Sequence, residues 1–325
     1  MTEIDLKRKC KDYYDWFVAH DYNFGISIYH LFYTMCKEVK NNLVIYERME
    51  NEYINMENFK KCDFLDKINL ARNFFQNINL DVDVDKAIND GTIDCYHANI
   101  LVNNIKTYLK GHVREVDNNN FDVLFPNSGL AVDLVIMLHE LGHYANKPNN
   151  KNEVSILTEG VALYTELQSY DYLSELGYKS EVDFYKIFRM KKICMDVRKY
   201  CDILPYFLTY ITYGDLTKEN FEKLFNDKDY YETINNIEYK DELFFSLFDM
   251  RYIFGILLAT YMYEKVKEDF SFTENINIFN KDLTKESFEE NLKKLGIENL
   301  DRYSIEMLSM SMKNYLKMDT YLKTV

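Results

Sequence analysis

Apolar residues recur at helical spacing along most of the chain. From Leu6 to about Asn79 they fall three or four positions apart, which predicts about three helices in that region. One such series is Phe24, Ile28, Leu31, Phe32 and Met35. From Glu153 onward the pattern is helical again, and the low content of helix breakers, 3 Pro and 10 Gly, favours long helices.

The pattern changes between residues 90 and 125. Asn89-Asp90-Gly91 is a turn signal, and β-branched residues occur from Val113 to Phe125 around the run Asn118-Asn119-Asn120. These features predict a small sheet or a pair of hairpin strands.

A strongly apolar helix is predicted directly after this β region. It covers Leu130–Ala145, and the run Lys147-Pro148-Asn149-Asn150 ends it. The expected fold class is therefore mainly α, with a small β element before this helix. We expect an N-terminal helical lobe over residues 1–85 and a second region over residues 86–325, with one continuous domain as the alternative.

The charge balance argues against a nucleic-acid partner. The chain has 39 Lys and Arg against 53 Asp and Glu, which gives a net charge of −14 at pH 7. An acidic chain without a basic block repels phosphate backbones instead of releasing their counterions. We therefore expect no binding to DNA or RNA.

The apolar stretches indicate a protein without a membrane partner. The longest, Phe244–Tyr263, contains Asp249 and Arg251, which are costly in hydrocarbon, so a buried helix is predicted. The charged start, Met1–Lys9, lacks the apolar segment of a secretory signal. The 6 cysteines are scattered without a CxxC pair, as in a cytoplasmic protein with reduced core thiols. No feature of the sequence indicates the oligomeric state.

The segment His139-Glu140-Leu141-Gly142-His143 carries the most informative chemistry. On a helix His139 and His143 lie about 40° apart on one face and can present two imidazoles to one metal ion. Glu140 is then placed to take a proton from a metal-bound water without binding the metal. Burying these groups in an apolar run costs several kcal/mol without partners, and a metal supplies the partner. The alternative is a pair of core histidines bonded to backbone carbonyls.

A third metal ligand is predicted on the next helix. Glu159 and Glu166 are seven residues apart, so both face the same side. A catalytic zinc has three protein ligands and a water. We expect Glu159 to be the third ligand and Glu166 to accept the free ring N–H of a ligating histidine. Glu153 is a weaker candidate ligand, and two solvated acids on a surface helix are the bland alternative.

This combination, HELGH followed by a Glu-x₆-Glu helix, resembles the gluzincin zinc metallopeptidases. Within that group it is most similar to the thimet oligopeptidase and oligoendopeptidase F family, and the resemblance covers about residues 125–315. Tyr252-Ile253-Phe254-Gly255 and Leu295-Gly296-Ile297 resemble C-terminal segments of the same family. The resemblance implies a helical metallopeptidase with a cleft between two lobes, one Zn²⁺ ion and a peptide or protein substrate.

The chain departs from that family on the substrate side. Glu242, Phe245 and Phe248 stand where the family carries a histidine and tyrosines that hold the substrate and its oxyanion. Tyr252 is the phenol that remains at this place, and we expect it to stabilise the oxyanion. The other candidates are tyrosines that share one helical face, and core packing is the alternative for all of them: Tyr206, Tyr210 and Tyr213.

The predicted activity is peptide-bond hydrolysis by a zinc-activated water, with Glu140 as general base. One alternative is a metal-dependent hydrolase dedicated to a single protein substrate. Another is a non-catalytic binding protein that keeps a zinc ion. A fourth protein ligand, for example His97 or His112, would indicate that last class, because structural zinc sites are closed.

Overall fold

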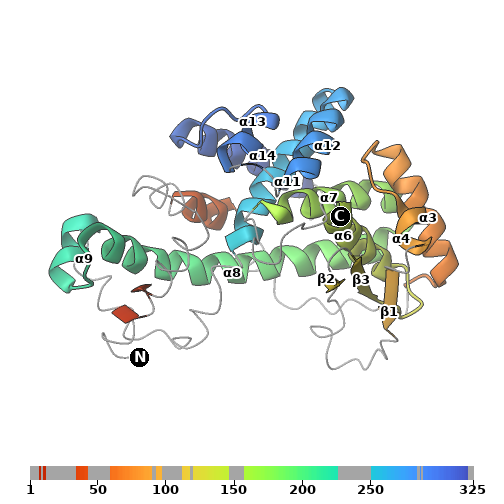
Figure 1. The fold of residues 1–325 in the computed structure, drawn as a ribbon, viewed down its shortest axis with the longest axis horizontal. Coiled ribbons are helices and arrows are strands. Elements are labelled where there is room, and N and C mark those ends of the chain that lie inside the picture. Colours follow the sequence, from red (N-terminus) through yellow and green to blue (C-terminus); the bar gives the residue numbers. More distant parts are fainter. Residues whose placement is uncertain are drawn as a thin grey trace.

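The computed structural model describes residues 7–8, 10–11, 34–42, 59–89, 93–96, 112–117, 120–145, 157–225, 250–283, 286 and 288–320. These residues form a mainly helical fold with a three-stranded sheet (Figure 1). The predicted class, mainly α with a small β element before the helix that carries His139, is confirmed. The division of the chain at residue 85 stays a prediction.

The sheet lies at one end of the helical assembly (Figure 1). β2 (His112–Asp117) and β3 (Asn120–Pro126) pair antiparallel, which confirms the hairpin predicted around the asparagine run. β1 (Ile93–Tyr96) pairs parallel with β3, so the strand order is β1-β3-β2. Val123 and Phe125 of β3 are buried and join the sheet to the helical core.

Three helices form the centre of the core. α6 (Val132–Ala145) follows β3 directly, α7 (Thr158–Glu175) packs along it, and α11 (Met250–Glu268) packs on the other side of α7. α6 ends at Ala145, where the helix was predicted to end, and begins two residues after the predicted start at Leu130. The part of the predicted apolar stretch that the structure describes, from Met250 to Tyr263, lies in the buried helix α11, as expected. Within the described residues, no helix combines the length and apolar character needed to cross a membrane.

The remaining elements surround this centre. α8 (Lys179–Tyr213) is 35 residues long and runs along the longest dimension of the molecule beneath α6 and α7 (Figure 1). It ends at Gly214, whose φ of 70° suits glycine. The other helices and their bounds are α3 (Phe64–Asn77), α4 (Val84–Asn89), α9 (Lys218–Phe225), η4 (Phe270–Phe272), α12 (Thr273–Asp282), α13 (Phe288–Lys294) and α14 (Arg302–Thr320).

A buried ion pair fixes α3 to the start of α6. Both side chains, Lys67 and Asp133, are fully buried, with Nζ 2.8 Å from Oδ2. Lys67 also donates to Oδ1 of Asn127 at 2.9 Å. Asp133 accepts from the backbone N–H and the hydroxyl of Ser128, at 2.7 and 2.9 Å. This network holds the first turn of α6 and thereby the helix that carries the histidines.

The Lys67→Met variant is expected to lose about 3 kcal/mol of unfolding free energy, because Asp133 then keeps a buried charge without its cation. Urea denaturation followed by circular dichroism measures the loss. The double variant Lys67→Met/Asp133→Leu, which removes both charges, should recover much of it. A single variant as stable as the wild type would contradict this role of the pair.

Candidate metal centre

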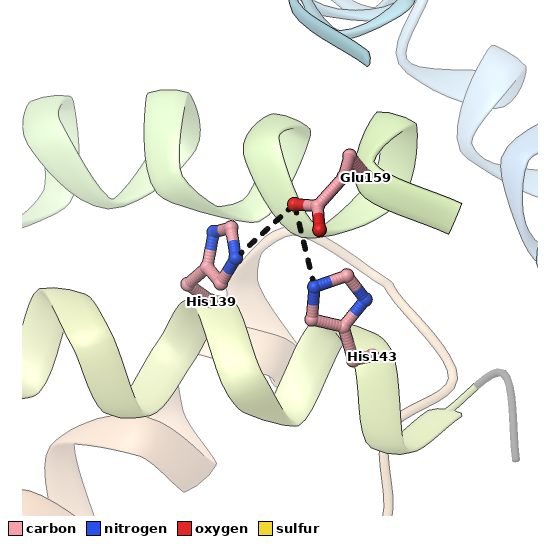
Figure 2. Close-up of side chains that lie close together, drawn as sticks. All are labelled: His139, His143 and Glu159. Atoms are coloured by element: carbon pink, nitrogen blue, oxygen red, sulfur yellow. Dashed lines mark ion pairs between the residues drawn. The ribbon is translucent and has the colours of Figure 1, made fainter. Parts of the chain in front are cut away.

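His139 and His143 lie one turn apart on α6 and face the first turn of α7, where Glu159 is found. Each histidine Nε2 is 3.5 Å from the same carboxylate oxygen, Oε2 of Glu159 (Figure 2). The two imidazole rings meet edge to face with centroids 4.9 Å apart. The three donor atoms all lie within 4.8 Å of one another. The structure therefore brings together the three predicted ligands.

This geometry fits a divalent metal ion. In a tetrahedral zinc site, ligand atoms about 2.0–2.1 Å from the ion lie about 3.3 Å from each other, close to the 3.5 Å observed here. His139 and Glu159 are almost entirely buried, with 3% and 1% of their surface exposed. Within the described part of the chain, neither oxygen of Glu159 makes a regular hydrogen bond. A buried group of this kind can hold a metal ion.

Glu140 lies on α6 beside both histidines and is also buried, with 6% of its surface exposed. Burial raises the pKa of its carboxyl group, while the charges of His139 and His143 act in the opposite direction. The side chain thus sits next to the predicted ligands without belonging to the group of three donors.

Glu166 lies at the opposite ring nitrogen of His139 from Glu159. Its Oε2 is 3.1 Å from Nδ1 of His139. A carboxylate at this ring nitrogen favours the tautomer whose proton is on Nδ1 and whose Nε2 lone pair is open to a metal. Burial lowers the pKa of His139, but Glu159 and Glu166 outweigh that effect and raise it to about 9.

Two residues that sequence reasoning missed hold Glu166. Arg189 of α8 contacts both carboxylate oxygens, with Nε 3.0 Å from each and Nη2 2.8 Å from Oε2. The hydroxyl of Tyr170 donates to Oε1 at 2.7 Å. Although burial alone would raise the pKa of Glu166, Arg189 and His139 lower it to about 2. Glu166 is therefore a fixed negative charge.

Glu159 also has a cation from another helix. Nε of Arg251, on α11, lies 3.0 Å from Oε1 of Glu159. Burial raises the pKa of Glu159, but His143, His139 and Arg251 together hold it well below its usual range. In the sequence, Arg251 stands out as a charge within an apolar stretch, and this was the available signal for a buried partner.

Tyr252, the predicted oxyanion donor, follows Arg251 on α11. Arg251 Nη2 donates to the Tyr252 hydroxyl oxygen at 3.4 Å, and the ammonium of Lys192 lies 4.9 Å from the ring centroid. Burial, followed by the charge of Glu159, raises the pKa of Tyr252, so its hydroxyl stays protonated. Tyr206 instead packs in the core against Phe221.

Some candidates cannot be placed. Glu153 and His97 lie outside the described residues, and His112 is in β2 but its side chain is not described. Among the described residues, the group that can hold a metal has three members, the number that a catalytic zinc site uses.

Comparisons with known proteins give a structural likeness. No protein-family model matches the chain, and no curated protein matches its sequence significantly. A crystal structure of a "putative peptidase" from Chlamydophila abortus matches with a TM-score of 0.55 and 14% sequence identity. The match covers 93% of this chain and 57% of that one, so this chain spans little more than half of the matched protein. At this identity the likeness concerns the fold alone.

Close helix contacts at two glycines set the spacing of the centre. A Cβ atom on Gly142 would lie 2.9 Å from Oγ1 of Thr165 and 3.0 Å from the α-carbon of Ala162, where α6 meets α7. A Cβ atom on Gly255 would lie 2.7 Å from Cβ of Glu159, where α11 meets α7. Gly142 therefore lets α6 and α7 approach each other closely, and Gly255 does the same for α11 and α7.

The Gly255→Ala variant is expected to lose about 1–3 kcal/mol of unfolding free energy, because the new methyl group forces α11 away from Glu159. The matched control is Gly160→Ala on the same interface, where the new Cβ would lie 3.3 Å from the flexible side chain of Leu258. Both variants gain the same helix propensity. Urea unfolding of the metal-free proteins compares them, and equal stability would contradict the close contact.

Proposed function

We propose that this protein is a zinc-dependent peptidase. The observation that carries the proposal is the meeting of His139, His143 and Glu159 at 3.5 Å contacts in a buried site, with Glu140 beside them. The fold likeness supports peptides or proteins as the substrate class, since the matched protein from C. abortus is described as a "putative peptidase".

In this proposal the residues of the chain have distinct roles. His139, His143 and Glu159 hold the zinc ion, which supplies a Lewis acid that makes a water acidic near neutral pH. Glu140 takes the proton of the water that attacks the scissile carbonyl and passes it to the leaving amine. The protonated hydroxyl of Tyr252 donates to the developing oxyanion. Glu166 fixes the orientation of His139.

The finer assignment is also part of the proposal. A glutamate as third ligand, on the helix after HELGH, supports the gluzincin type. The Glu159–Glu166 spacing and the segment from Tyr252 to Gly255 support an oligopeptidase related to the thimet oligopeptidase and oligoendopeptidase F family. A cytoplasmic location is consistent with the free, buried cysteines among those whose side chains the structure describes, Cys10, Cys36, Cys62 and Cys194.

The Glu140→Gln variant is expected to keep its zinc and to lose at least about 100-fold in turnover, because general-base catalysis contributes about 10²–10⁴. Metal analysis of the wild type should give one zinc per chain, and a fluorogenic peptide library measures turnover. The matched control is Glu175→Gln, an exposed glutamate at the far end of α7. Full turnover by Glu140→Gln would refute the mechanism, and a wild type without metal would refute the site.

The same experiment, together with a structure of the zinc-loaded protein, separates the alternatives. A protein that binds zinc but cleaves no library peptide would favour a hydrolase dedicated to one protein substrate. Four protein ligands in the zinc-loaded protein would favour a non-catalytic binding protein, since a closed coordination sphere leaves no position for water.

The Glu166→Gln variant is expected to bind zinc about 10–100-fold more weakly, because His139 loses the carboxylate that orients its ring. The substitution also leaves Arg189 without its buried partner, so stability falls as well. The double variant Glu166→Gln/Arg189→Met should recover stability but not zinc affinity. Competition with a chelator measures the affinity and urea unfolding measures the stability. Wild-type affinity in the folded single variant would contradict the orienting role.

A further inference from the structure

The two oxygens of the Glu159 carboxylate have different partners. Oε2 lies 3.5 Å from Nε2 of both His139 and His143 (Figure 2). The other oxygen, Oε1, lies 3.0 Å from Nε of Arg251. The arginine therefore occupies the oxygen that the histidines leave unused.

Arg251 reaches a second group with the other end of its guanidinium. Nη2 lies 3.4 Å from the hydroxyl oxygen of Tyr252, and Cζ is 5.0 Å from the centroid of the tyrosine ring. The Arg251 side chain is 19% exposed, whereas Glu159 is 1% exposed. Arg251 thus lies between a buried carboxylate and the phenol at the more open side of the centre.

We propose that Arg251 is a positioning residue that restricts Glu159 to one metal-binding oxygen and aligns the hydroxyl of Tyr252. This inference rests on the proposed zinc site and adds to it a residue that the HELGH motif and the downstream glutamates do not contain.

The restriction follows from the chemistry of the two groups. A carboxylate with both oxygens open binds a metal ion through one oxygen or through two. The planar, permanently charged guanidinium holds one oxygen with a charge-assisted contact, and the other oxygen is left for the metal. Three protein donor atoms then bind the ion, and a position remains for water. The charge of Arg251 also withdraws electron density from Glu159, which makes the ion a stronger Lewis acid.

The alignment of Tyr252 follows from the direction of the hydrogen bond. Arg251 can only donate, so the tyrosine oxygen accepts and its own proton points elsewhere. That proton is then available to a substrate oxygen. A lysine at position 251 presents a single compact ammonium on a flexible stem and cannot make both contacts with the same geometry.

Cobalt substitution tests the restriction without an activity assay. Four-coordinate Co²⁺ absorbs visible light more strongly than five-coordinate Co²⁺. The cobalt-loaded wild type should show the strong, four-coordinate spectrum. The Arg251→Met variant should show a weaker, five-coordinate spectrum because Glu159 then binds through both oxygens. Arg251→Lys should keep the strong spectrum, because its ammonium still holds Oε1, and so should Tyr252→Phe. The control is Arg72→Met, which removes a more exposed ion pair between Arg72 of α3 and Asp85 of α4.

A crystal structure of the zinc-loaded wild type gives the same answer without any variant. We expect Glu159 to bind zinc through Oε2 alone while Oε1 contacts Arg251. This result does not depend on whether the Arg251→Met variant folds. Binding through both oxygens, or an unchanged cobalt spectrum in folded Arg251→Met, would overturn the inference and leave the zinc site standing. A wild type that binds neither metal would overturn the proposed function itself.

Discussion

A carboxylate buried in a helical core has to be matched by positive charge, and α7 carries two such buried carboxylates. Glu159 and Glu166 lie on one face, with 1% and 0% of their surface exposed. Each has its own arginine, Arg251 from α11 and Arg189 from α8. An unpaired buried charge costs several kcal/mol, so these two contacts constrain how α8 and α11 pack around α7.

The same helix also presents both carboxylates to α6. Oε2 of Glu159 faces two histidine nitrogens, and Glu166 faces the far side of the His139 ring. α6 and α7 approach closely because Gly142 carries no side chain where they cross, and α11 approaches α7 closely because of Gly255. Charge pairing and close backbone contact therefore act at the same place, and together they form a centre whose donors are already in position for a metal ion.

Part of this centre was predictable from the sequence because it is local. The spacing of His139 and His143, and that of Glu159 and Glu166, follow from helical geometry alone. The hairpin before α6 could also be predicted from its turn residues and β-branched positions. The partners Arg189 and Arg251 could not, because they reach α7 through the packing of distant helices. The spacing of residues along one helix does not reveal that packing, although the charge of Arg251 inside an apolar stretch indicated a buried partner.

The pairing of Glu159 and Glu166 with an arginine each also bears on how the proposed metal ion would be acquired. With Arg251 on Glu159 and Arg189 on Glu166, neither acid depends on a metal to balance its charge in the interior. Zinc fingers behave differently, because without their ion they do not fold. If the proposed site binds zinc, a chain built like this one would reach its native shape before the ion enters, and chelation would leave an intact protein that can be refilled.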